Sequence, residues 1–131
     1  MLSHPRPRFN AETFLRNVVG QNAEELARFF APGAVVYWRN TNEEFTAEEY
    51  VLVNCKYPGD WNGVLERVEN INDGVVTIAK VWGSGGAFRV VSFITLVDGK
   101  ITCLDEYWGD ITEAPEWRRE MKIGKPIKCR S

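Results

Sequence analysis

The sequence is poor in the residue types from which metal sites, disulfide frameworks and nucleophilic dyads are built. It has a single histidine, His4, and three cysteines, Cys55, Cys103 and Cys129, with no short spacing between them. This pattern predicts neither a disulfide framework nor a zinc site. We therefore expect no bound metal and no cofactor, and we expect the protein in the reducing cytoplasm.

Long apolar stretches and an even charge distribution are also missing. No run approaches the roughly 18 apolar residues of a membrane-spanning helix, and residues 1–8 lack the apolar core of a signal peptide. We expect no membrane contact. Residues 9–117 hold eight basic and 17 acidic residues, whereas residues 118–131 hold six basic residues and one acid. The acidic body argues against nucleic acid as a partner. We divide the chain into a flexible leader (1–8), one domain (9–117) and a basic tail (118–131).

Apolar residues at helical spacing predict three helices in the first half of the chain. Asn10 is a candidate N-cap for the first helix. The pairs Asn22/Glu25 and Thr46/Glu49 have the spacing of a capping box and mark the starts of the second and third helices.

From residue 61 onward, the pattern changes to strands. Four long strands are separated by the turn signals Asn72-Asp73-Gly74, Gly83–Gly86 and Asp98-Gly99. A short strand at 34–38 precedes the third helix. The predicted fold class is α+β, with three N-terminal helices packed on a curved antiparallel sheet of four long strands plus a short strand.

Apolar residues occupy both faces of this predicted sheet, unlike a sheet with one wet face. We place the even-numbered strand residues beneath the helices and the odd-numbered ones, such as Val75, Val81 and Ile101, on the outer face. Three helices cover only one face. We therefore expect a homodimer in which the second copy covers the outer face.

Two segments carry a resemblance to a known superfamily. Residues 27–36 read Ala-Arg-Phe-Phe-Ala-Pro-Gly-Ala-Val-Val, and residues 98–108 read Asp-Gly-Lys-Ile-Thr-Cys-Leu-Asp-Glu-Tyr-Trp. With the order of elements, they resemble the nuclear transport factor 2-like (NTF2-like) superfamily, which includes SnoaL-like and ketosteroid-isomerase-like proteins, over about residues 10–117. The resemblance implies a cystatin-like cone with a pocket between the concave face and the helices, usually in a dimer. Function varies widely within such a fold.

The resemblance permits a residue-by-residue comparison with active members. The catalytic tyrosine and two aspartates of ketosteroid isomerases fall at Phe14, Trp38 and Ser92, so that mechanism is absent. In epoxide-hydrolase-like members, an Arg-x-Asp pair stands where this chain has Lys80-x-Trp82, although Glu106 matches the acid of the last strand. Dehydratase members rely on histidines, and the single histidine here lies in the leader.

Glu106 is the candidate acid–base residue, because its apolar neighbours Leu104 and Trp108 would raise its pKa by desolvation. Lys80 is a candidate to stabilise an enolate-like oxygen or to hold a ligand carboxylate. The alternative is an inert ion pair between Lys80 and Glu106. The candidate ligand-binding residues are Trp38, Tyr50, Asn54, Trp82, Ser92, Leu104 and Trp108.

Three functions remain open at this point. The first is a small-molecule-binding domain with an aromatic-lined pocket for an apolar or aromatic ligand. The second is a cofactor-independent isomerase, cyclase or dehydratase that uses Glu106 for proton transfer. The third is a dimeric interaction domain whose basic tail engages an acidic partner. We favour the first of these functions, because indoles and one carboxylate gather on one predicted face.

No metal site is expected near Glu106. Asp105 and Asp110 lie near it in the sequence, but Asp105 faces the other side of the sheet and no histidine or cysteine joins them.

Overall fold

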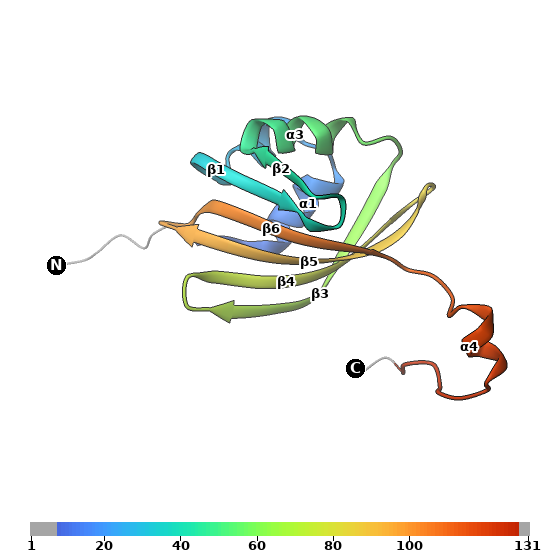
Figure 1. The fold of residues 1–131 in the computed structure, drawn as a ribbon. Coiled ribbons are helices and arrows are strands. Elements are labelled where there is room, and N and C mark those ends of the chain that lie inside the picture. The colour runs from blue at the N-terminus through green and yellow to red at the C-terminus, as the bar shows by residue number, and fades with distance from the viewer. Residues whose placement is uncertain (1–7, 129–131) are drawn as a thin grey trace.

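A computed structural model of the chain describes residues 8–128; residues 1–7 and 129–131, which include His4 and Cys129, lie outside the described part. Most of the helical residues lie in the first half of the chain, and the four long strands follow them (Figure 1). The elements are α1 (Ala11–Val19), α2 (Ala23–Ala27), β1 (Phe30–Trp38), the 3-10 turn η1 (Arg39–Thr41), β2 (Glu43–Thr46), α3 (Ala47–Lys56), β3 (Trp61–Ile71), β4 (Gly74–Gly83), β5 (Gly86–Val97), β6 (Lys100–Asp110) and α4 (Glu116–Glu120).

The six strands form one sheet in the order β2-β1-β6-β5-β4-β3. Strands β3 to β6 form the predicted antiparallel meander, and the α+β fold class is confirmed. The strand count differs, because β2 is an additional edge strand that pairs with β1. The sheet is also mixed rather than purely antiparallel, since β1 runs parallel to β6. A fourth short helix, α4, follows the sheet.

Helices α1 and α3 start where the capping signals place them. Asn10 Oδ1 accepts from Thr13 N at 3.0 Å. The Thr46 and Glu49 side chains each accept from the other's backbone N–H, which completes a capping box. The capping box expected at Asn22 is wrong, because the Asn22 side chain donates to Asn17 Oδ1 instead.

Helix α2 ends at Ala27, where the backbone that follows it is hydrogen-bonded to the β5–β6 hairpin. Lys100 Nζ donates to the Arg28 carbonyl oxygen, and Ile101 N donates to the Phe29 carbonyl oxygen at 2.8 Å. These bonds satisfy carbonyls at the end of the helix and start β1 at Phe30.

The three N-terminal helices pack on one face of the sheet and share a single main core. Leu26 from α2 and Tyr50 from α3 are fully buried in it together with Val36, Ile94 and Leu104 from the strands. A smaller cluster of Ala79, Val81 and Val90 lies beside this core. The interior face of the sheet is therefore lined by even-numbered residues on β5 and on most of β6, as predicted.

The face predicted for β4 is wrong. Val81 pairs with Phe88 and Thr77 pairs with Ser92, so odd residues of β4 share a face with even residues of β5. Thr77 and Val81 are accordingly buried beneath the helices, and Lys80 lies opposite Arg89 on the outer face.

The face predicted for Ile101 is also wrong. Leu96 pairs with Ile101, but Thr95 pairs with Cys103, which leaves Thr102 as an extra residue in β6. Such a bulge reverses the alternation of side chains. Ile101 therefore points inward before the bulge, and Leu104 points inward after it.

The outer face of the sheet carries the exposed apolar residues that the sequence indicates. It also holds ion pairs, among them Arg39 with Asp105 and Arg89 with Glu66. The large apolar side chains exposed on this face include Val64, Trp82, Phe93, Val97 and Tyr107.

The C-terminal segment leaves the sheet after β6, and α4 lies apart from the helices α1 and α3 (Figure 1). Its apolar residues are exposed, among them Trp117, Met121 and Ile123. No helix within residues 8–128 has the length and apolar character that a membrane crossing requires.

Candidate functional site

A cavity of about 600 Å³ lies where the ends of α1 and α3 approach η1, the start of β3 and the end of β6. Its volume is within the range of small-molecule sites, about 300–1,000 Å³. Most of its exposed wall is apolar. The lining residues are Val18, Val19, Gln21, Trp38, Asn40, Thr41, Glu43, Asn54, Tyr57, Trp61, Val81, Phe88, Trp108, Gly109 and Asp110.

Five aromatic rings form a continuous arc along this cavity. The ring centroids are 5.7 Å apart between Tyr57 and Trp61 and 5.8 Å apart between Trp61 and Phe88. The arc continues from Phe88 to Trp108 at 6.1 Å and from Trp108 to Trp38 at 6.4 Å. Most of these contacts are edge-to-face, an arrangement that stabilises aromatic clusters. The arc joins β1, β3, β5 and β6 into one wall.

Glu106 lies beneath this wall and is only 4% exposed. Its Oε2 accepts from Ser92 Oγ at 2.7 Å, and its Oε1 accepts from Trp38 Nε1 at 3.1 Å. Trp108 Nε1 is buried and makes no well-directed hydrogen bond within residues 8–128, although it lies close enough to favour the ionised carboxylate. Desolvation outweighs these donors and raises the pKa of Glu106 above its ordinary value.

The structure separates Lys80 from Glu106. Lys80 lies on the outer face, where its Nζ is 5.7 Å from the centre of the Trp82 ring. Glu106 points to the inner face, opposite Ser92. The expected placement of Lys80 and Trp82 in the pocket is therefore wrong, and so is the alternative of a Lys80–Glu106 ion pair. The reason is the even-length β4–β5 turn, which places odd residues of one strand opposite even residues of the next.

The other predicted ligand-binding residues divide into those that line the cavity and those buried beneath or beside it. Trp38, Asn54 and Trp108 line the cavity itself. Tyr50, Ser92 and Leu104 are buried beneath or beside it, and none of the three is part of its wall. Tyr50 packs its ring against Trp38, with centroids 6.2 Å apart. Burial raises the pKa of the Tyr50 hydroxyl, so that it stays protonated at neutral pH.

Sequence reasoning missed much of the lining. Tyr57 at the end of α3 and Trp61 at the start of β3 flank the turn at Pro58-Gly59, and both line the cavity. Glu43 on β2 and Asp110 at the end of β6 both line the cavity, although they are far apart in sequence. For Asp110, the even register of β6 was an available signal.

Asp105 and Cys103 play no part in this cavity. Asp105 lies on the outer face and receives two hydrogen bonds from Arg39, at 2.7 and 2.8 Å. Burial raises the pKa of the Cys103 thiol, which disfavours the reactive thiolate. Within residues 8–128 no three His, Cys, Asp or Glu side chains gather in a way that could hold a metal ion.

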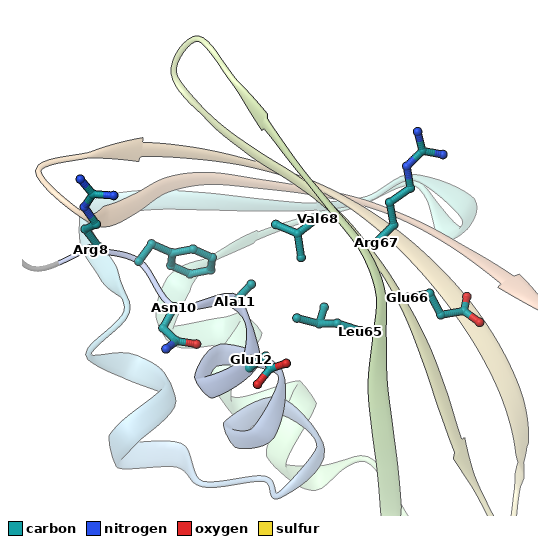
Figure 2. Close-up of a pocket in the computed structure, with 9 residues that line it drawn as sticks. Arg8, Asn10, Ala11, Glu12, Leu65, Glu66, Arg67 and Val68 are labelled. Atoms are coloured by element: carbon teal, nitrogen blue, oxygen red, sulfur yellow. The ribbon is translucent and has the colours of Figure 1, made fainter. Parts of the chain in front are cut away.

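A second hollow, of about 500 Å³, lies between the start of α1 and β3 (Figure 2). It is more open to solvent than the aromatic cavity. Two of its charged side chains are engaged elsewhere, because Glu66 pairs with Arg89 and Arg67 pairs with Glu69. Figure 2 shows Glu66 and Arg67 pointing away from α1, whereas Leu65 and Val68 face it. We therefore place the candidate site in the aromatic cavity.

Comparison with known proteins identifies the fold. No protein-family model and no curated protein sequence matches the chain. Structural neighbours are ketosteroid-isomerase-like, NTF2-like and SnoaL-like proteins. A candidate ketosteroid isomerase from Kribbella flavida DSM 17836 is 24% identical, covers 90% of this chain and 88% of its own, and has a TM-score of 0.71.

Two further neighbours have the same architecture. An NTF2-like protein of unknown function from Burkholderia xenovorans LB400 is 16% identical, with a TM-score of 0.72 over 89% of this chain and 91% of its own. A ketosteroid-isomerase-like protein from Catenulispora acidiphila DSM 44928, in complex with trimethylamine, is 15% identical, with a TM-score of 0.66 over 73% of this chain and 82% of its own. The chain therefore has the NTF2-like fold, as the sequence resemblance implies.

Proposed function

We propose that this protein is a small-molecule-binding domain whose ligand, apolar or aromatic, occupies the aromatic cavity. The single observation that carries the proposal is the continuous arc of five rings around a space of about 600 Å³. Aromatic walls with a few polar groups are typical of ligand pockets. A cavity of this size favours ligand binding over the interaction domain, which needs no such space. The trimethylamine complex of one neighbour supports a small molecule in this fold.

In this proposal Glu106 is a positioning residue. Its bond to Trp38 Nε1 orients an indole of the cavity wall, and Ser92 in turn orients the carboxyl group. Both oxygens are engaged by protein donors, so the carboxyl group needs no contact with the ligand.

The proposal is tested by filling the cavity. Val81 is buried and lines it, so Val81→Phe adds a ring where the ligand would lie. The neutral probe 2-phenylethanol is titrated while tryptophan fluorescence and indole N–H signals are followed. We expect shifts for Trp61 and Trp108, and a loss of binding of about tenfold or more in Val81→Phe.

The matched control is Val64→Phe, which makes the same change on the outer face of β3, where Val64 pairs with Lys80. Its affinity for 2-phenylethanol is expected to equal that of the wild type. A thermal unfolding curve for each variant shows that it is folded. Equal affinity of the wild type and a folded Val81→Phe variant contradicts the proposal.

A second candidate function is proton transfer by Glu106, as in a cofactor-independent isomerase, cyclase or dehydratase. The raised pKa of this buried carboxyl group supports it. The probe is 1-indanone, a flat aromatic ketone whose α-hydrogen exchange in D₂O is followed by NMR. Exchange that the wild type accelerates and Glu106→Gln does not would support this function. If 1-indanone exchanges no faster with the wild type than in buffer alone, this second function is ruled out.

We also propose that a second copy covers the outer sheet face to form a homodimer. The exposed side chains of Phe93 and Tyr107 pack on each other there, with ring centroids 6.2 Å apart, and leave an apolar surface without a cover. Sedimentation velocity is expected to give a dimer for the wild type and a folded monomer for Phe93→Glu. A wild-type monomer at all concentrations overturns this proposal.

A further inference from the structure

The charged side chains that line the aromatic cavity are all acidic. They are Glu43 at the start of β2 and Asp110 at the end of β6, and no lysine or arginine within residues 8–128 contributes to the lining. Thr41 Oγ1 donates to Glu43 Oε1 at 2.6 Å and orients that carboxylate. The cation closest in sequence, Arg39, is held on the outer face by Asp105. The cavity mouth therefore has a net negative charge.

Two of the three amide side chains of the lining, Gln21 and Asn54, donate their N–H groups to backbone carbonyl oxygens and leave acceptors. Gln21 Nε2 donates to the carbonyl oxygens of Asn54 and Tyr57, at 2.9 and 2.7 Å. Asn54 Nδ2 donates to the Val18 carbonyl oxygen at 3.0 Å. Gln21 Oε1 and Asn54 Oδ1 make no hydrogen bond within the described part of the chain. Both amides thus offer oxygen, rather than N–H, to a ligand.

Two of the three indole N–H groups of the lining are engaged in the same way. Trp61 Nε1 donates to the Pro58 carbonyl oxygen at 3.0 Å, and Trp38 Nε1 donates to Glu106. These rings therefore present their π-systems to the cavity rather than their donors. The polar donors left on the lining side chains are uncharged: the amide of Asn40, the hydroxyl of Tyr57 and the buried Nε1 of Trp108.

We propose that the ligand of this cavity is an organic cation, an amine with a positively charged nitrogen on an apolar or aromatic body. This inference rests on the proposed function, since it specifies the ligand of the same site. An ammonium group supplies the N–H donors that Glu43, Asp110 and the two amide oxygens lack. The surrounding rings attract it through their negative faces. An anionic ligand of the same shape meets two carboxylates and no cation, so it is disfavoured.

The test compares three ligands that share a phenyl ring and a short chain. Phenethylamine is positively charged at neutral pH, 2-phenylethanol is neutral and 3-phenylpropionate is negatively charged. Dissociation constants are measured with the full chain by calorimetry and tryptophan fluorescence. We expect phenethylamine to bind about tenfold more tightly than 2-phenylethanol, and 3-phenylpropionate to bind most weakly. The preference should decrease as salt is added.

Substitutions that each remove one negative charge show whether the preference for the positively charged ligand comes from the cavity. Glu43→Gln and Asp110→Asn should each reduce the affinity for phenethylamine about three- to tenfold and change that for 2-phenylethanol by less than about twofold. The control is Glu44→Gln, which removes the same charge from the neighbouring residue, outside the lining. Its effect on both ligands should be less than about twofold.

The outcomes separate this inference from the proposed function. If the amine and the alcohol bind equally, or the carboxylate binds best, the cation inference fails while the cavity remains a ligand site. If none of the three ligands perturbs the cavity tryptophans, both fail. If Glu44→Gln weakens phenethylamine as much as Asp110→Asn does, the preference comes from the charge of the whole protein, and the cation site is overturned.

Discussion

The substitution Glu106→Gln isolates the free energy that ionisation of one buried carboxyl group contributes to folding. Glutamine has nearly the same shape, and its Oε1 can still accept from Trp38 Nε1. Its amide N–H can donate to Ser92 Oγ, which lies 2.7 Å from the present carboxylate oxygen. The packing around the side chain is therefore retained, and the ability to ionise is what the substitution removes.

The magnitude follows from proton linkage. Burial raises the pKa of Glu106 in the folded protein above its ordinary value of 4.5. Below pH 4.5, the carboxyl group is protonated in both the folded and unfolded states, so its burial as an ion does not reduce the free energy of unfolding. As the pH rises above this value, the unfolded chain releases the proton and the folded chain keeps it. The wild type then loses about 1.4 kcal/mol of unfolding free energy per pH unit, until the pH reaches the folded pKa and the loss stops.

The assay is urea and thermal unfolding of both proteins between pH 4 and pH 8. Near pH 4, the two should have similar stability. At higher pH, Glu106→Gln should become the more stable protein, and each kcal/mol should raise its melting temperature by about 3–5 °C relative to the wild type. The control is Glu44→Gln, an exposed carboxylate on β2, whose difference from the wild type should stay within about 0.5 kcal/mol.

A stability difference between Glu106→Gln and the wild type that does not change with pH would refute this reasoning. So would a difference of the opposite sign, with the variant losing stability relative to the wild type as the pH rises. Either result means that the carboxylate is ionised at little cost in the folded state, and that the indole and hydroxyl donors outweigh burial.

Three further substitutions test how the fold is held together, each by urea unfolding at neutral pH. Thr46→Ala removes the hydroxyl that accepts from Glu49 N at 3.1 Å, and should cost about 0.5–2 kcal/mol. Leu104→Ala empties a fully buried position, and should cost about 2–5 kcal/mol. Gly74→Ala places a Cβ against the Ile94 carbonyl oxygen, and should cost about 1–3 kcal/mol or more because backbone must move.

The outcomes that contradict these predictions differ in kind. A Thr46→Ala variant as stable as the wild type means that the α3 cap is not needed once the helix is packed. A Gly74→Ala variant with the same free energy of unfolding as the wild type means that the backbone at the start of β4 can move without cost. A Leu104→Ala loss below about 1 kcal/mol means that the main core collapses around the missing side chain.

Local signals account for the elements that the sequence predicts well. The Asp98-Gly99 turn has φ of 51° and 78° at its two residues, the conformation for which an Asp-Gly pair is suited. The caps of α1 and α3 also depend on residues three positions apart. Such features are determined by short-range sterics and hydrogen bonds, so they can be inferred before the fold is known.

The faces of the strands depend on counting across turns and bulges. The even-length turn between β4 and β5 exchanges odd and even faces, and moves Lys80 and Trp82 out of the pocket. A count of the turn residues would have shown this. The bulge at Thr102 follows from no local motif in the sequence, yet it allows Ile101 and Glu106 to point to the same face.

By itself, the sequence determined the three helices and the meander of long strands, because each depends on nearby residues. The tertiary structure alone decided that Trp61, Phe88 and Trp108 form one wall and that Glu43 and Asp110 line the same cavity. These residues come from different strands, and their distances depend on strand order, sheet curvature and the positions of the helix ends. No periodicity within one segment encodes such distances.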